Sequence, residues 1–108
     1  MARRAVNLLP STKRALEKVG ANIKRARLRR NIRAELLAER AGISADTLSS
    51  IEKGVCTVSV GAYAAVLASL GMEKDIELLG AEEEQKRRYR EFNLKTRKRA
   101  TKRPKKNN

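Results

Sequence analysis

The side chains with the greatest capacity for chemistry in this sequence are its cations. Lys and Arg number 26 against 12 Asp and Glu, which gives the 108-residue chain a formal net charge of +14. Cations in this excess bind phosphate groups and release the counterions around them, so a nucleic acid or an acidic membrane surface is favoured as the partner. With two Tyr, one Phe and no Trp, the chain offers few aromatic platforms on which the bases of a single strand could stack.

Other chemistries are excluded by the residues that the sequence lacks. It contains no His, and Cys56 is its one Cys, so a His-based catalytic triad, a Cys/His zinc cluster and an intrachain disulfide are ruled out. It also lacks the Gly-rich loop, GxxxxGK followed by Ser or Thr, that cradles phosphates in nucleotide-binding enzymes. We expect a protein that is not an enzyme and that holds no metal and no cofactor.

No segment of the sequence is apolar enough to enter a membrane. The longest weakly polar run, residues 58–72, is interrupted by two Ser and two Gly and is shorter than a bilayer span. The short apolar stretches before Pro10 do not form a secretory signal. The sequence therefore predicts a cytoplasmic protein, associated with the nucleoid if it binds DNA, and no membrane partner.

The positive charge is unevenly distributed along the chain. Residues 12–80 contain twelve basic and eight acidic side chains, a net charge of +4, whereas residues 86–108 contain twelve basic side chains and one Glu, a net charge of +11. Like charges at this density oppose folding, so we expect disorder from about residue 94. The sequence thus predicts a folded domain over 12–80, followed over 81–108 by a charged helix or linker and a basic, mostly disordered tail.

The segment that joins these two parts carries charges at helical spacing. Three consecutive Glu, at 82–84, each precede a Lys or Arg by four residues, the spacing at which ion pairs stabilise a helix. A short solvent-exposed helix over about 81–92 and a linker that is helical only part of the time both fit this pattern.

Apolar periodicity predicts four helices in the folded domain. The first follows Ser11 as an N-cap and ends near Asn31, the second covers about 33–40 and the third about 45–53, and the fourth follows Ser59. The residues expected to face the core are Leu16, Val19, Ile23, Ala26, Leu36, Leu37, Leu48, Ile51, Val60, Tyr63, Ala64, Val66, Leu67 and Leu70. Residues 74–79 fit either a fifth short helix or a strand.

The turn between the second and third helices has specific residue types. Gly42 can adopt the positive φ that ends a helix, Ile43 provides an apolar anchor, and Ser44 can cap the helix that follows. Two short helices joined by a glycine-containing turn of three or four residues form a helix-turn-helix.

The first helix has a basic face, which carries Lys24, Arg25, Arg29 and Arg30. A face of this kind is commonly just solvated, and the alternative is an edge that contacts phosphate.

This region resembles the lambda-repressor/Cro-like (XRE) family of helix-turn-helix proteins over roughly residues 19–72. The stretches that carry the resemblance are Ile23-Lys24-Arg25-Ala26-Arg27, Leu37-Ala38-Glu39-Arg40-Ala41-Gly42-Ile43-Ser44, Thr47-Leu48, Ile51-Glu52-Lys53-Gly54 and Leu67-Ala68-Ser69-Leu70-Gly71. It implies an all-α fold of five helices around one core, and a homodimer that binds a double-stranded DNA operator. It also implies that Arg27 pairs with Glu52 and so holds the third helix on the body of the domain.

In that family the third helix lies in the major groove, and its first residues meet the base edges. Carried over to this sequence, the resemblance gives as DNA-binding residues Arg33, Ala34, Ser44, Ala45, Asp46, Thr47, Ser50 and Lys53. An alternative role for Ser44, Asp46 and Thr47 is to cap the helix and to supply a favourable carboxylate in its first turn; Ser44 can serve both as cap and as contact.

The sequence departs from the family at two of these positions. Arg33 and Ala34 stand where a Thr or Ser cap followed by Gln is usual, and the third helix has no Arg, Gln or Asn before Lys53. Bidentate contacts to bases are therefore missing. DNA shape, the spacing of the dimer and the basic tail would carry more of the specificity and affinity.

Within the family, the short chain, residues 59–79 and the C-terminal extension are similar to HipB-type proteins, which are DNA-binding antitoxins encoded beside a HipA-like kinase toxin. This similarity implies a transcriptional repressor that regulates its own toxin–antitoxin operon and binds such a toxin. Two alternatives fit the same residues: a nonspecific nucleic-acid-binding protein dominated by its basic tail, and a protein-interaction module that binds a toxin partner.

Overall fold

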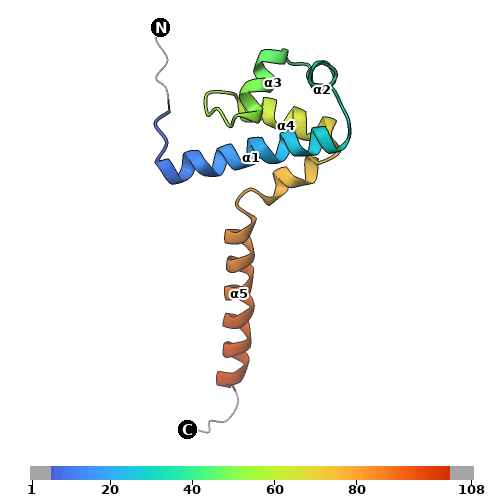
Figure 1. The fold of residues 1–108 in the computed structure, drawn as a ribbon. Coiled ribbons are helices and arrows are strands. Elements are labelled where there is room, and N and C mark those ends of the chain that lie inside the picture. The colour runs from blue at the N-terminus through green and yellow to red at the C-terminus, as the bar shows by residue number, and fades with distance from the viewer. Residues whose placement is uncertain (1–5, 103–108) are drawn as a thin grey trace. The chain divides into compact units, whose positions relative to one another are not determined.

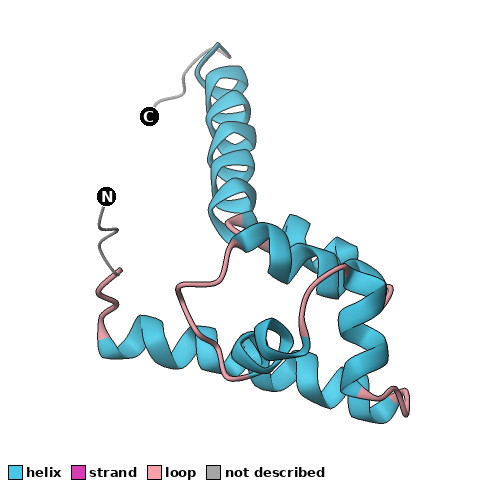
Figure 2. Cartoon of the chain, turned by 90° about the horizontal axis from the view of Figure 1, so that it is seen from above, coloured by secondary structure: helices cyan, strands magenta, loops and turns pink. Residues whose placement is uncertain are grey.

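The computed structural model of the protein describes the backbone of residues 6–102 and the side chains of residues 6–94. Every regular element of the described chain is a helix, as Figures 1 and 2 show. The elements are α1 (Pro10–Arg29), α2 (Ala34–Ala41), α3 (Ala45–Glu52), α4 (Val60–Ser69), the 3-10 helix η1 (Glu73–Leu78) and α5 (Ala81–Lys102). The expected all-α fold class is confirmed. Of residues 74–79, for which helix and strand were both open, residues 74–78 belong to η1 and Leu79 lies in the turn that follows.

The chain divides into two units, Met1–Ile76 and Glu77–Asn108, which are described separately. The domain limits of 12–80 and 81–108 stay a prediction. In the first unit α2 packs on α3 and α4, and α3 packs on α1, so that α2, α3 and α4 gather on one side of α1 (Figure 1). The buried apolar residues of this unit are Ile23, Ala26, Leu37, Ala38, Leu48, Ile51, Tyr63, Val66 and Leu70.

α1 begins two residues earlier than expected and without the predicted cap. Leu9 is the N-cap residue, Pro10 occupies the first helical position, and Ser11 lies inside the helix. Pro is favoured there because its fixed φ suits a helix and its missing N–H would have no partner at that position. Ser59 caps α4 as expected, since its Oγ accepts a hydrogen bond from the N–H of Ala62 at 3.1 Å.

Two residues expected in the core lie at the surface. Val60 is 69% exposed because it is the first residue of α4, ahead of the turns that pack on the core, and Val19 is 37% exposed. The residue of α1 that is buried next to Val19 is Gly20. A search for periodic apolar side chains does not detect Gly20, because this residue has no side chain and is buried by the backbone that lies against it.

α5 is longer than the helix expected in the second unit. It continues to Lys102, whereas the sequence predicted a helix to about residue 92. Lys and Arg are good helix formers, and no Gly or Pro interrupts the segment before Pro104. Residues 103–108, the end of the predicted disordered tail, lie outside the described residues. The ion pairs along the first half of α5 are Glu82–Lys86, Glu84–Arg87, Glu84–Arg88, Arg87–Glu91 and Glu83–Arg90.

Candidate nucleic-acid interface

The turn between α2 and α3 is closed by backbone hydrogen bonds. Gly42 has a φ of 73°, a conformation that is strained for a residue with a Cβ and free of strain for glycine. Its N–H donates to the carbonyl of Glu39 at 3.1 Å, and the N–H of Ile43 donates to the carbonyl of Ala38 at 3.0 Å. These bonds satisfy the last carbonyls of α2 and fix the direction in which the chain enters α3.

Ser44 is the N-cap residue of α3. Its Oγ accepts a hydrogen bond from the N–H of Thr47 at 3.0 Å and donates one to Oγ1 of the same residue at 2.9 Å. The hydroxyl hydrogen of Ser44 is thereby used within the protein. The hydroxyl hydrogen of Thr47 remains available to an acceptor outside it.

α3 lies against the backbone of α1 with no side chain of α1 between them at the closest point. A Cβ atom on Gly20 would lie 2.5 Å from the carbonyl oxygen of Ile51 and 2.7 Å from that of Glu52. Just after α3, Gly54 has a φ of 76°, and a Cβ there would lie 2.5 Å from the Cα of Glu17. Two glycines therefore allow the end of α3 to approach α1 to backbone contact.

A buried ion pair joins α1 to the same end of α3. Arg27 donates from Nε to Glu52 Oε2 at 2.7 Å and from Nη2 to Oε1 at 3.2 Å, and its Nη1 donates to the carbonyl of Ile32 at 3.0 Å. The side chains of Arg27 and Glu52 are 10% and 9% exposed. The hydrogen bond to Glu52 raises the pKa of Arg27 above its ordinary value, against the opposing effect of burial. The guanidinium stays charged and ties α1, the α1–α2 connection and α3 together.

The predicted DNA-binding residues lie at the start of α2 and along α3. On α3 and its flanks, the exposed residues are Ser44, Ala45, Asp46 and Lys53, and the half-buried ones are Thr47 and Ser50. Arg33 is exposed at the N-cap position of α2, where its side chain forms no cap hydrogen bond. Ala34 packs against the core, so its side chain is turned to the interior.

The exposed face of α3 includes a residue that the resemblance did not give. Ser49 is exposed, three residues after Asp46 and four before Lys53, so the three lie on one face of the helix. The sequence contained the signal, because Leu48 and Ile51 define the buried face and a period of 3.6 puts Ser49 outside. The side chain of Asp46 forms no hydrogen bond or ion pair with any residue that the structure describes, so its carboxylate is an available acceptor.

Comparison with known proteins agrees with this geometry. A family model described as a helix-turn-helix domain matches residues 18–85, more than half of the chain, including α2, the turn and α3. The chain belongs to this helix-turn-helix family. Membership indicates a DNA-binding regulator. No curated protein and no solved structure matches the chain.

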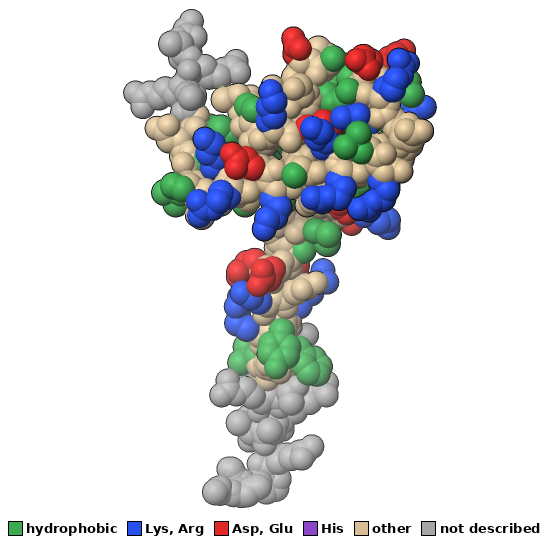
Figure 3. Space-filling model, in the orientation of Figure 1, with side chains coloured by type: hydrophobic (Ala, Val, Ile, Leu, Met, Phe, Trp, Pro, Cys, Tyr) green, Lys and Arg blue, Asp and Glu red, His purple; other side chains and the backbone are tan. Residues whose placement is uncertain are grey.

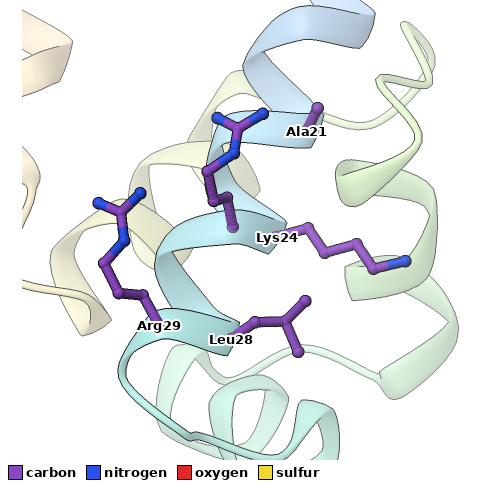
Figure 4. Close-up of a pocket in the computed structure, with 5 residues that line it drawn as sticks. Ala21, Lys24, Leu28 and Arg29 are labelled. Carbon is purple, nitrogen blue, oxygen red and sulfur yellow. The ribbon is translucent and has the colours of Figure 1, made fainter.

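This helix-turn-helix protein also has a basic surface on α1. Lys24, Arg25 and Arg29 surround Leu28, which is 57% exposed, in a shallow pocket (Figure 4). Figure 3 shows Lys and Arg gathered over α1 at the lower edge of the first unit. On the helix, Arg25 and Arg29 lie about 140° and 180° from Gly20, on the side away from α3, whereas Lys24 lies only about 40° from Gly20. Phosphate binding by the basic face of α1 stays a prediction.

The described part of this helix-turn-helix protein offers little for other kinds of site. Within it, no three His, Cys, Asp or Glu side chains lie close enough together to hold a metal ion. None of the helices that the structure describes is both long enough and apolar enough to cross a membrane. Cys56 is half-buried, and its Sγ donates to the carbonyl of Val6 at 3.7 Å.

Proposed function

We propose that the protein is a sequence-specific transcriptional repressor that binds a double-stranded DNA operator as a dimer. The observation that carries the proposal is the attachment of α3 to α1, through Gly20 and the pair of Arg27 and Glu52, beside an α3 face that takes no part in the core. A helix held in this way enters the major groove in a fixed orientation, which direct readout of base edges requires.

The side chains at the start of α3 suit a limited set of base contacts. Thr47 can donate its hydroxyl hydrogen to an acceptor such as N7 of a purine, and Asp46 can accept from a base amino group such as N4 of cytosine. Ala45 can contact the methyl group of thymine. None of these contacts is bidentate, so DNA shape and the spacing of two half-sites supply part of the specificity.

Two exposed cations flank this face and suit phosphate contacts. Lys53 follows α3, and Arg33 precedes α2, whose first N–H groups have no side-chain cap. Each phosphate contact makes affinity fall more steeply with salt, by about 0.9 decade per decade of salt, through counterion release. Replacement of Lys53 by Ala should therefore weaken binding to all sequences to a similar extent and reduce the salt dependence by about that amount.

Footprinting on the DNA upstream of the protein's own gene tests the proposal. We expect two protected half-sites about 34 Å apart. Asp46→Ala should raise affinity for random DNA, because it removes a carboxylate that repels phosphate. It should also reduce the ratio of operator to random binding about tenfold, or ~1.4 kcal/mol. Lys53→Ala is the matched control, which should leave this ratio unchanged. Protection without paired half-sites, or an unchanged ratio in the Asp46 variant, contradicts the proposal.

We further propose that the operon is a toxin–antitoxin operon whose toxin is a HipA-like kinase. The support is the resemblance to HipB-type proteins within the lambda-repressor/Cro-like family, carried by residues 59–79 and the C-terminal extension. The test has two steps: the adjacent reading frame should encode a kinase-like protein, and the two purified proteins should form a stable complex. A neighbouring gene of another kind, or two proteins that elute separately, counts against a toxin partner.

A second candidate is a nonspecific nucleic-acid-binding protein, favoured by the net charge of +11 in residues 86–108. Deletion of residues 95–108 separates the two. If the shortened chain still prefers its operator over random DNA, the helix-turn-helix reads the sequence and the second candidate fails. If the full-length chain shows no preference and the deletion removes most of its affinity, the second candidate holds.

A further inference from the structure

Uncharged residues form a line along one face of α5, here called the seam, and nearly all of the remaining residues of the helix are charged. The seam is spaced 4, 4, 3, 4 and 4 residues apart and consists of Ala81, Gln85, Tyr89, Phe92, Thr96 and Ala100. This spacing places the six positions on one face of the helix. Of the remaining residues of α5, all are charged except Asn93, Leu94 and Thr101.

The centre of the seam is aromatic and accessible. Tyr89 and Phe92 are 67% and 68% exposed, and hydrophobic side chains of the second unit gather together in Figure 3. Large apolar side chains grouped on a highly charged surface mark a contact site for another protein surface.

The seam has the same spacing in both chain directions. It is symmetrical about the point between Arg90 and Glu91, so an antiparallel pair of α5 helices brings every seam position opposite another seam position. The facing pairs are Ala81 with Ala100, Gln85 with Thr96, and Tyr89 with Phe92. We propose that α5 is the dimerisation helix of this protein and that the partner of its seam is α5 of a second copy, packed antiparallel. A two-fold axis requires such a self-complementary surface.

The charges of α5 fit the same register. The opposed residues of unlike charge are Glu82 with Arg99, Glu83 with Lys98, Glu84 with Arg97, and Arg90 with Glu91. Lys86 opposite Lys95 is the one like-charged pair. The side chains of Glu82 and Glu83 are 83% and 75% exposed, although they lie 3.3 and 3.7 Å from Lys86 and Arg90 of their own helix. Both carboxylates therefore remain accessible to a second chain.

A parallel pair of α5 helices is disfavoured by the same charges. Residues 95–102 contain five Lys and Arg and no acidic residue, and a parallel arrangement would bring these two segments together. Like charges that face each other across a helix pair repel, and an antiparallel arrangement places the acidic start of each helix beside the basic end of the other. The orientation of the dimer thus follows from the charge order along the chain.

Cross-linking tests the orientation and the register. In the full-length chain with Cys56→Ser, a second substitution places a thiol at either end of the seam, Ala81→Cys or Ala100→Cys. Under mild oxidation, a mixture of the two variants should form mixed disulfide dimers, whereas each variant alone should remain largely uncross-linked, because a disulfide needs its two Cα atoms within about 7 Å. Efficient dimers of the Ala81→Cys variant alone would indicate parallel helices and overturn the proposal, as would the absence of mixed dimers.

A charge exchange tests whether α5 holds the dimer together. One variant replaces the three Glu at 82–84 by Lys, and the other replaces residues 97–99 by Glu. By sedimentation equilibrium at physiological salt, each variant alone should self-associate at least about tenfold more weakly than wild type, and an equimolar mixture should recover the wild-type affinity. The control replaces three exposed cations of α1, Lys13, Arg14 and Lys18, by Glu and should dimerise as wild type does. A monomeric wild-type chain, or dimers that persist in both variants, would overturn the proposal.

The inference rests on the proposed function only in that both require a dimer, and the two can fail separately. If the chain dimerises through α5 but protects no paired half-sites, the repressor proposal fails and the dimer surface stands. If paired half-sites are protected and the charge exchange leaves the dimer intact, the dimer forms through another surface and this inference fails.

Discussion

Removal of the Glu52 carboxylate should destabilise the first unit, because it leaves the buried charge of Arg27 without its partner across the contact between α1 and α3. In Glu52→Ala, Arg27 keeps its hydrogen bond to the carbonyl of Ile32 and a weaker electrostatic attraction to Glu35, and its side chain, 10% exposed in the wild type, loses its ion-pair partner. The loss of one partner of a buried ion pair costs about 3–5 kcal/mol, and we expect the lower end of this range because the pair lies at the edge of a small unit. A loss of about 3 kcal/mol corresponds to a fall in Tm of about 12–24 °C for a domain of this size.

Tyr63 allows this loss to be measured in the first unit alone. The sequence has two Tyr and no Trp, so Tyr89→Phe leaves Tyr63 as the one Tyr or Trp fluorophore of the chain. Tyr63 is buried, and its hydroxyl donates to the carbonyl of Val55 at 2.8 Å, so its emission should change when the unit unfolds. Urea titrations of the Tyr89→Phe chain, with and without Glu52→Ala, give the difference in free energy of unfolding.

Two further variants separate the buried ion pair from a general effect of charge. Glu39→Ala removes a carboxylate from an exposed position of α2 and should change the free energy of unfolding by no more than about 0.5 kcal/mol. The double replacement Arg27→Met with Glu52→Leu should cost less than Glu52→Ala, because it leaves no buried charge without a partner. Equal losses for Glu52→Ala and Glu39→Ala would refute the reasoning.

Three other predictions follow from single residues. Gly20→Ala should lower the free energy of unfolding by about 1–3 kcal/mol in the same urea titration, because its Cβ would lie 2.5 Å from the carbonyl oxygen of Ile51; wild-type stability would contradict the close approach. Burial raises the pKa of Tyr63 above 10.0, so in a chain with the other Tyr replaced by Phe, phenolate absorbance should appear above pH 10. The unit should lose stability as the pH rises through that range. Hydrogen bonds from Arg87 lower the pKa of Glu84 below 4.5, so helix content measured by circular dichroism should fall as the pH drops below 4.5, and fall less in Glu84→Gln.

The helix-turn-helix was predictable from the sequence because its signals are local. Gly42 ends α2 through its own φ, and the Oγ of Ser44 reaches a backbone N–H only three residues further on. The same holds for Ser59 at the start of α4. Each of these residues acts within its own turn of chain, where residue type and conformation are directly related.

The attachment of α3 to α1 was not predictable from residue patterns. From the sequence alone, a glycine inside a helix only indicates a lower helix stability. A glycine is needed at position 20 because the backbone of Ile51 and Glu52, far along the chain, lies against it. Nor did spacing or periodicity identify Arg27 as the partner of Glu52; only resemblance to a family did. The helix expected over about 81–92 was based on the spacing of its Glu, Lys and Arg residues, and it did not include the good helix propensity of the Lys and Arg that follow, up to Lys102.

The contact at Gly20 has a consequence for how this protein can change. Backbone atoms and the Arg27–Glu52 pair hold α3 in place, and the exposed Ala45, Asp46 and Ser49 contribute nothing to that attachment. Substitutions at these three positions should therefore carry little stability cost, the largest being the loss of the favourable Asp46 carboxylate in the first turn of α3, about 0.3–1 kcal/mol. The exposed residues of α3 can therefore change while the packing of α3 on α1 stays the same. A library randomised at these three positions should consist mostly of folded proteins with altered DNA preferences.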